Sequence, residues 1–236
     1  MLCFGHRGAK GHAPENTLKS IRKALELAAD WIEIDVFYVD QQLLVFHDET
    51  LERTTNGKGL LSDKTFSYLR SLDAGEGERI PILGEVFDTI AARAGINIEI
   101  KGPNAAPAVV NVVRDRIDRG WDIGRILISS FDHRELVHVR ELDQSIRIGV
   151  LLDGIPPTYP AIAQTVNAYS VHQRIEDIDD RFIREAHDCG LRVFVYTVNS
   201  PQEIRAMASM GVDGVFTDYP DRVVSVVKQA RTYTNR

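Results

Sequence analysis

The sequence predicts an α/β fold, a (β/α)8 TIM barrel with a small insertion over its C-terminal face. Short β-rich runs alternate with helical patterns along nearly the whole chain, which is typical of βα units around a parallel sheet. Polar residues recur where the expected strands end, which is where such barrels carry their active sites. The 236 residues, 44% of them hydrophobic, suffice for one compact domain of barrel size. We therefore expect residues 1–236 to form a single domain.

Eight runs have the composition of buried parallel strands, and amphipathic stretches separate them. The expected strands are Leu2–His6, Trp31–Val36, Ile96–Ile100, Ile126–Ser129, Arg147–Leu152, Ala168–His172, Arg192–Thr197 and Gly214–Thr217. The expected helices include Asn16–Ala29, Ala106–Asp118, Arg134–Leu142, Arg181–Cys189, Gln202–Ser209 and Arg222–Ala230. Eight strands are the number that closes a barrel of this kind.

A further extended run, Leu43–His47, follows the second strand after only residues 40–42. That connection is too short for a parallel crossover, so we expect a hairpin. With its turn centred near Gln41, Asp35 and His47 should come close together. The next segment, from about Glu49 to Gly84, is turn-rich and the least barrel-like part, and we interpret it as the insertion over the barrel mouth.

Composition and charge exclude several classes of partner and location. The formal charge of −6 leaves no basic surface of the kind that nucleic-acid backbones require. No run approaches the roughly 18 apolar residues of a membrane span, and we expect no stable membrane insertion. The opening residues lack a charged leader and a cleavage site, so we predict no signal peptide and a cytoplasmic protein. Cys3 and Cys189 have no metal-ligand or redox spacing and are expected to be reduced packing residues.

Three carboxylates should meet at the barrel mouth. Alternate residues of a strand face the same side, so Glu33 and Asp35 should point inward together, as should Glu99 and Lys101. Unpaired carboxylates would repel one another and resist burial, whereas a hard divalent cation with oxygen ligands would stabilise them. Glu33, Asp35 and Glu99 are therefore predicted metal ligands. The alternative is a set of surface or salt-bridged carboxylates, with Arg7 and Lys101 as partners.

The same mouth should hold cations and titratable groups. Arg7 and Lys101 suit a phosphate oxygen that gains charge during displacement. His6 and His47 can move protons near neutral pH, so they are expected to act as an acid/base pair on either side of a metal-bound phosphodiester. Asp48 is expected to orient a loop or a histidine. His172 also ends a strand, but packing is the favoured role for it.

Several motifs together resemble the glycerophosphodiester phosphodiesterase family, and the likeness covers nearly all of the chain. The early motifs are HRG at His6–Gly8, PENT at Pro14–Thr17, Glu33–Val36, His47–Thr50 and Asn97–Lys101. The later ones are Ser129–Phe131, Tyr196–Asn199 and Gly211–Asp218. One such motif would be weak evidence, but this ordered set is specific.

The resemblance implies hydrolysis of small-molecule glycerophosphodiesters to glycerol 3-phosphate and an alcohol, in lipid and glycerol metabolism. It implies Mg²⁺ or Ca²⁺ on Glu33, Asp35 and Glu99, His6 and His47 as acid and base, and Arg7 and Lys101 on the phosphate. Glu15 is expected to touch the metal shell or a glycerol hydroxyl. Phe131 and Tyr196 are expected to form an apolar wall for the glycerol carbons or to serve in packing. Asn16 lies where a helix N-cap belongs.

Two departures from the family pattern concern the surroundings of the site. Only Glu76 and Gly77 separate Gly75 from Glu78 where the family commonly has a longer, aromatic-rich stretch, so part of a lid is expected to be missing. Tyr196 stands where many relatives have Trp, which predicts a more polar wall.

Two alternatives to this function are open. A lysophospholipase-D-like hydrolase would need an apolar lid, which the short segment and the acidic charge disfavour. A non-catalytic barrel that binds phosphodiesters would not require a paired acid and base.

Overall fold

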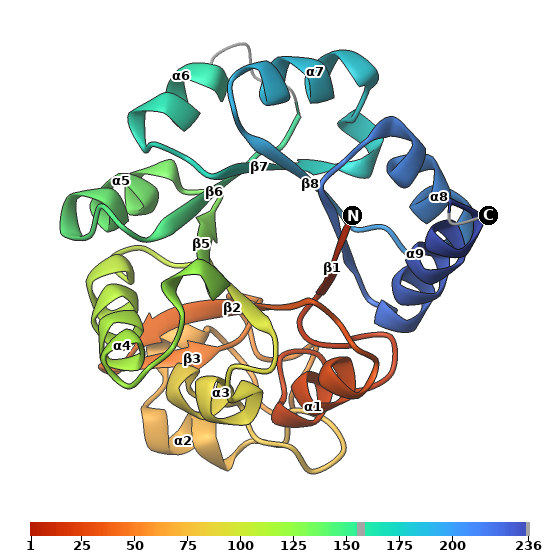
Figure 1. Cartoon of the computed structure of the whole chain (residues 1–236). Coiled ribbons are helices and arrows are strands. Elements are labelled where there is room, and N and C mark those ends of the chain that lie inside the picture. The colour runs from red at the N-terminus through yellow and green to blue at the C-terminus, as the bar shows by residue number, and fades with distance from the viewer. Residues whose placement is uncertain (155–158, 235–236) are drawn as a thin grey trace.

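The computed structural model describes residues 1–154 and 159–234, and there the chain forms a closed parallel barrel inside a ring of helices (Figure 1). The barrel strands are β1 (Leu2–Gly5), β2 (Trp31–Val39), β4 (Gly95–Ile100), β5 (Ile126–Ser130), β6 (Arg147–Leu151), β7 (Ser170–Arg174), β8 (Arg192–Tyr196) and β9 (Gly214–Thr217). They pair in chain order, and β1 pairs in parallel with both β2 and β9, which closes the barrel. The predicted (β/α)8 barrel is confirmed.

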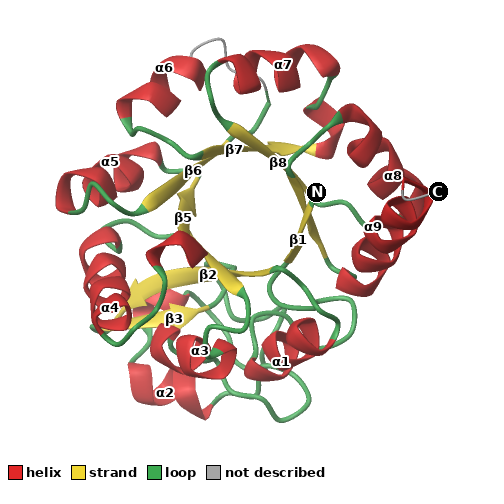
Figure 2. Cartoon of the chain, viewed as in Figure 1, coloured by secondary structure: helices red, strands yellow, loops and turns green. Residues whose placement is uncertain are grey.

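A helix follows every barrel strand and lies on the outside, as Figure 2 shows. The ring consists of α1 (Leu18–Glu26), α3 (Leu83–Ile90), α4 (Ala106–Asp118), α5 (His133–Leu142), α6 (Tyr159–Thr165), α7 (Asp180–Asp188), α8 (Pro201–Met210) and α9 (Pro220–Thr234). The expected helices did not include α3 and α6, which have only 8 and 7 residues and so give few turns over which a helical period can be recognised. Among the described residues, no helix is both long and apolar enough to cross a bilayer.

Alternation along each strand divides the core into two parts. On β2, Ile32 and Ile34 are fully buried in the main apolar cluster, which the helices also line. Each such buried side chain contributes about 1.5–3 kcal/mol of hydrophobic stabilisation. The other face of the strands points into the barrel, where Phe4, Phe194 and Phe216 form a separate aromatic cluster with ring centroids 4.7 Å apart for Phe4–Phe194 and Phe4–Phe216. This cluster packs inside the barrel.

The predicted hairpin forms, but in a register one residue away from the expected one. Strand β3 (Gln42–Val45) pairs antiparallel with β2, and its two turn residues, Asp40 and Gln41, have φ of 47° and 61°. Two left-handed central residues make a tight two-residue turn, so the turn is centred between Asp40 and Gln41. The backbone N–H of Phe46 therefore donates to the Asp35 carbonyl at 3.0 Å. Phe46 thus lies opposite Asp35, the position that was predicted for His47.

The segment between β3 and α3 packs at the side of the barrel, against the hairpin (Figure 1). It contains a 3-10 turn, Leu61–Asp63, and α2 (Phe66–Ser71). A second apolar cluster joins it to the hairpin and consists of Val39, Leu44, Phe46, Leu51, Leu61, Leu69, Leu72, Ala74 and Ile80. The guanidinium of Arg70 also binds the Glu85 carboxylate at 2.8 and 2.9 Å, which ties α2 to the start of α3. The insertion is therefore a small packed unit beside β3.

Candidate active site

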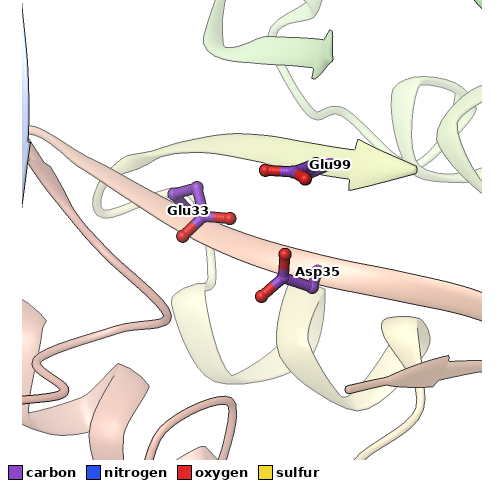
Figure 3. A group of neighbouring side chains, drawn as sticks. All are labelled: Glu33, Asp35 and Glu99. Carbon is purple, nitrogen blue, oxygen red and sulfur yellow. The ribbon is translucent and has the colours of Figure 1, made fainter. Parts of the chain in front are cut away.

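Three carboxylates converge inside the barrel near the C-terminal ends of two neighbouring strands. Glu33 and Asp35 come from β2 and Glu99 from β4, and the Cα positions of Asp35 and Glu99 are partners in the sheet register. One oxygen from each lies within 4.8 Å of the others. Figure 3 shows the three side chains pointing toward one another. This is the convergence that the alternation of residues predicted.

Burial and mutual repulsion disfavour the ionised state of this cluster. Burial raises the pKa of Glu33 well above its ordinary value, and the charges of Asp35 and Glu99 raise it further. Burial and the charge of Asp35 likewise raise the pKa of Glu99 to about 7. Glu33 Oε1 is buried without a hydrogen-bond partner in the described chain. A divalent cation with oxygen ligands would fit this donor set, since it would satisfy that oxygen and stabilise all three charges.

The positively charged side chains of Arg7 and Lys101 lie beside the carboxylates, as predicted. Arg7 Nε is 3.3 Å from Asp35 Oδ2, and Lys101 Nζ is 2.8 Å from Glu99 Oε1. The ion pairs that formed the alternative interpretation therefore exist. Two positively charged side chains cannot neutralise three ionised carboxylates. Glu33 Oε1 also has no hydrogen-bond partner among the described residues. The ion pairs and a cation site are thus compatible.

The turn after β1 holds Glu33 through its backbone. Arg7 has φ of 50° and its N–H donates to Glu33 Oε2 at 2.7 Å. Gly8 follows with φ of 84°, and a Cβ there would lie 2.4 Å from Ser20 Oγ on α1. Only glycine accommodates both the left-handed backbone and the close helix. The HRG motif therefore shapes the turn that supports the carboxylates.

Each candidate histidine is oriented by an aspartate. His6 Nδ1 lies 2.7 Å from Asp218 Oδ1, and His47 Nδ1 lies 2.5 Å from Asp48 Oδ1. The hydrogen bond from Arg53 lowers the pKa of Asp48 to about 2. Burial opposes ionisation of Asp218, but the hydrogen bond from His6 keeps its pKa below the ordinary value. Both carboxylates are therefore ionised acceptors, which fixes the proton of each imidazole on Nδ1.

The Nε2 atoms of the two histidines lie beside the cations. Arg7 Nε donates to His6 Nε2 at 3.2 Å, and Lys101 Nζ lies 3.3 Å from His47 Nε2. Burial is the main cause that lowers the pKa of both histidines, so both are neutral near pH 7. Two neutral imidazoles thus present Nε2 lone pairs beside the candidate phosphate-binding groups.

Glu15 belongs to an ion-pair network at the rim of the site. Its carboxylate accepts hydrogen bonds from Arg7 Nη1 at 2.6 Å and from Arg53 at 2.7 and 2.8 Å. Burial alone would raise the pKa of Glu15, but the two arginines lower it to about 2. Arg53 also binds Asp48 through Nη2 at 3.0 Å. Arg53, which belongs to the insertion, therefore binds both Glu15 and Asp48. Glu15 in turn holds Arg7, and Asp48 holds His47.

Asn16 has a different role from the expected helix cap. The N-cap of α1 is Thr17, whose side chain accepts a hydrogen bond from the Ser20 N–H at 3.1 Å. Asn16 is left-handed, with φ of 58°, and its side-chain amide donates to Asp35 Oδ2 at 2.9 Å. The residue supports a carboxylate of the cluster instead of the helix.

A cavity of about 240 Å³ adjoins the carboxylates. It is lined by His6, Arg7, Glu33, His47, Asn97, Glu99, Lys101, Phe131, Leu151, His172, Tyr196, Thr197 and Phe216. The rings of Phe131 and Tyr196 meet edge to face with centroids 6.0 Å apart, and the Tyr196 hydroxyl donates to the Leu152 carbonyl at 2.6 Å. The two rings therefore form a wall of the cavity. Asp35 and Glu15 are not among the lining residues: Asp35 contributes to the carboxylate cluster, and Glu15 binds the Arg7 guanidinium.

Several residues of the site were missed or undervalued from sequence. Asp218 directly follows β9, so its strand-end position could have indicated its role. Asn97 lies two residues before Glu99 on the same strand, and the alternation rule places it on the inward face as well. Arg53 had no such signal, because it lies in an irregular segment. His172 lines the cavity, although packing was the favoured role.

The chain is similar to several known proteins along nearly its whole length. A family model described as the glycerophosphoryl diester phosphodiesterase family matches residues 6–222. A protein of Caldanaerobacter subterraneus named glycerophosphodiester phosphodiesterase is 35% identical over 97% of this chain and 98% of its own. One of Bacillus altitudinis with the same name is also 35% identical, over 97% and 98%. An Oleispira antarctica phosphodiesterase, solved with the product sn-glycerol-3-phosphate, superposes with a TM-score of 0.89 at 29% identity, over 97% of both chains.

Proposed function

Because the chain belongs to the glycerophosphoryl diester phosphodiesterase family and is a phosphodiester hydrolase, we propose that it converts glycerophosphodiesters to glycerol 3-phosphate and an alcohol with the help of a divalent cation. One observation carries the proposal: three inward carboxylates lie within 4.8 Å of one another, beside two histidines that aspartates orient. Binding alone would require neither a paired acid and base nor their supporting aspartates.

Glu33, Asp35 and Glu99 would hold Mg²⁺ or Ca²⁺, both of which take oxygen ligands. When bound, the cation supplies Lewis-acid stabilisation of a phosphoryl oxygen. The guanidinium of Arg7 and the ammonium of Lys101 bind the remaining phosphate oxygens, and they stabilise the negative charge that grows there as the nucleophile attacks. Their present pairing with Asp35 and Glu99 holds them ready for the phosphate.

His6 and His47 exchange the protons of the reaction at Nε2. One neutral imidazole takes the proton of the attacking hydroxyl, and the other first takes up a proton from solvent at Nε2 and then gives it to the oxygen of the leaving alcohol. Asp218 and Asp48 keep Nδ1 protonated and stabilise the imidazolium. The same pair serves whether the nucleophile is water or the neighbouring glycerol hydroxyl.

The other residues predicted to contact the substrate are Phe131, Tyr196 and Glu15. Phe131 and Tyr196 form an apolar wall for the glycerol carbons, and the bond from the Tyr196 hydroxyl to Leu152 holds that ring in place. Glu15 acts on the substrate through Arg7, whose guanidinium it orients. A tyrosine instead of a tryptophan in this wall makes it smaller and more polar.

The decisive experiment is release of glycerol 3-phosphate from a substrate panel, with and without a chelator. Glycerophosphocholine and glycerophosphoethanolamine should be hydrolysed, chelation should abolish turnover, and Mg²⁺, Ca²⁺ or Mn²⁺ should restore it. Full activity after removal of divalent ions would contradict the cation requirement. Faster hydrolysis of lysophosphatidylcholine would favour a lysophospholipase D instead, and binding without turnover would favour a non-catalytic barrel.

A further inference from the structure

A groove of about 830 Å³ adjoins the cavity at the C-terminal ends of the neighbouring strands β7 and β8 (Figure 1). Four residues line both this outer groove and the cavity: Phe131, Leu151, Tyr196 and Thr197. Another groove near the site, of about 590 Å³ beside Arg53, shares no lining residue with the cavity. The outer groove is therefore placed to hold the part of a phosphodiester that extends beyond the cavity.

Among the described residues, the rim of the outer groove carries more negative than positive charge. Three carboxylates surround the guanidinium of Arg174 at the end of β7: Asp153 at 3.1 Å, Glu176 at 3.6 Å and Asp177 at 4.0 Å. One guanidinium cannot neutralise three ionised carboxylates. The side chains of Asp153 and Glu176 are 75% and 66% exposed, so they can approach a bound ligand. This rim therefore favours a positively charged group over a negatively charged one.

The hydroxyl of Tyr196 indicates the sign of this charge at the junction of the groove and the cavity. Burial is the main cause that raises its pKa, and the charge of Asp153 raises the pKa further. Arg174 acts in the opposite direction, but its effect is smaller than that of Asp153. The charges of the rim therefore combine to a negative potential at the Tyr196 ring.

An aromatic wall lies at the same junction. Phe131 is 41% exposed, and its ring meets that of Tyr196 edge to face with centroids 6.0 Å apart. Lys101 Nζ lies 5.7 Å from the centroid of the Phe131 ring, so this ring already attracts one cation. Aromatic rings attract quaternary ammonium groups in the same way. The wall and the acidic rim therefore favour the same kind of ligand.

The two ends of a glycerophosphodiester differ in chemistry. The glycerol is the same in all of them, whereas the leaving alcohol varies in size and charge. Inside the cavity, Arg7 and Lys101 would repel an ammonium group. The groove, at about 830 Å³ against about 240 Å³ for the cavity, has more room, and the excess charge of its rim is negative. An alcohol that carries an ammonium group therefore fits the outer groove.

We propose that the outer groove binds the leaving alcohol, and that Asp153, Glu176 and Phe131 select alcohols that carry an ammonium group, such as choline and ethanolamine. The proposal rests on the proposed function. The two acids attract the positive charge, and the ring packs against the groups around the nitrogen. A neutral alcohol gains only the apolar contact, and an anionic alcohol is repelled. This binding acts on the substrate and the transition state alike, so it should appear in kcat/KM.

The test compares glycerophosphocholine with its carbon isostere, in which a neutral tert-butyl group replaces the trimethylammonium group. The readout is the ratio of their kcat/KM values, charged over neutral, with the divalent cation present. The two alcohols also differ in reactivity, so the change of this ratio between variants is what counts. Asp153→Asn combined with Glu176→Gln should lower the ratio roughly 3- to 10-fold, whereas Arg174→Gln should raise it. Higher ionic strength should lower the wild-type ratio, because salt screens exposed charges.

Phe131→Leu tests the aromatic part of the site. It keeps an apolar side chain but removes the ring, and we expect the ratio to fall roughly 2- to 5-fold. Any loss of contact with the glycerol cancels in the ratio, because both diesters have the same glycerol. The matched control is an exposed ion pair on α4, Asp115 and Arg119, which lies 2.8 Å apart and does not line the groove. Asp115→Asn and Arg119→Gln should both keep the wild-type ratio.

The outcomes separate this proposal from the proposed function. Hydrolysis of both diesters with one ratio in the wild type and in the variants of Asp153, Glu176 and Arg174 would overturn the groove and leave the proposed function intact. Release of glycerol 3-phosphate from neither diester would overturn the proposed function. Titration with choline, followed by NMR, needs no turnover: choline should bind the wild type more tightly than the variant without the two acids. Equal affinities would overturn the selection whatever the activity.

A change of the ratio in the same direction in the acid and the arginine variants would also contradict selection by charge. Loss of folded protein cannot imitate the expected result, because a ratio within one enzyme is independent of how much of it is folded.

Discussion

Asp218 Oδ1 lies 2.7 Å from Nδ1 of His6, although 212 positions separate the two residues in the chain. The other Asp218 oxygen accepts a hydrogen bond from the Asn199 amide at 2.9 Å, so the carboxylate is held on both sides. Closure of the barrel brings β9 beside β1 and creates this contact. His6 therefore owes its tautomer and its orientation to the last strand of the barrel.

Replacement of this acid should reduce turnover. Asp218→Asn retains the shape but can donate to Nδ1, which would move the imidazole proton to Nε2 and remove the support for the imidazolium. We expect kcat to fall roughly 10- to 100-fold. The measurement is kcat together with calorimetric affinity for the divalent cation, which should stay unchanged because Asp218 does not belong to the carboxylate cluster. Wild-type kcat in this variant would show that His6 does not depend on Asp218.

Arg53 should couple the insertion to catalysis. It binds Glu15, which holds Arg7, and Asp48, which holds His47. We expect Arg53→Ala to lower kcat roughly 10-fold or more, because small displacements of reacting groups are costly. Arg53→Lys should recover little, since an ammonium cannot reproduce the fork of hydrogen bonds.

A matched variant for Arg53 exists within the same insertion. Arg70→Ala removes the ion pair with Glu85, which also anchors the insertion but does not contact the site. It should lower the melting temperature and leave kcat close to the wild-type value. Equal loss of kcat in the Arg53 and Arg70 variants would mean that the insertion acts only through its overall packing.

The two histidines should differ in their response to the leaving group. His6→Ala and His47→Ala should each lower turnover of glycerophosphocholine by roughly 10²- to 10⁴-fold, with binding affected less. A p-nitrophenyl diester leaves without protonation, so the variant that lacks the general acid should recover much of its rate on that substrate. The variant that lacks the base should not. Equal impairment of both on the activated substrate would contradict the division into acid and base.

The carboxylate cluster should make the metal-free protein less stable as pH rises. The pKa of Glu99 is raised to about 7, and that of Glu33 is also raised, above their values in the unfolded chain. The folded state therefore binds more protons, so this contribution to stability is present below about pH 4.5 and is lost as pH rises through about 7. The measurement is the melting temperature of chelated wild type minus that of Glu99→Gln, from pH 5 to pH 8. The difference should fall with pH, and a flat difference would contradict the raised pKa.

A divalent cation should reverse this destabilisation. At a concentration one hundred times its Kd it should stabilise the folded state by about 2.7 kcal/mol, or raise the melting temperature by roughly 5 to 10 °C. Glu33→Gln should lose most of that rise and should be more stable than the wild type without metal, because an amide cannot ionise and so never carries the buried charge that this site disfavours. An equal rise in the variant would show that the cation binds elsewhere.

The barrel and its carboxylate cluster could be predicted from the sequence, because both depend on local regularities. Strand and helix periods repeat along the chain, and residues two apart on a strand face the same side. That rule alone predicted that Glu33, Asp35 and Glu99 would converge, and the structure brings their oxygens within 4.8 Å. The same rule places Asn97 on the inward face with Glu99, but an uncharged side chain gives no sign of a metal or catalytic site in the sequence.

Tertiary structure decided which residues support the site. The backbone angles of Asp40 and Gln41 determine the hairpin register, and therefore place Phe46 instead of His47 opposite Asp35. Only barrel closure joins Asp218 to His6, and only the packing of the insertion brings Arg53 to Glu15 and Asp48. Local periodicity specifies the direction in which a side chain points, whereas its partner depends on contacts between segments far apart in the chain.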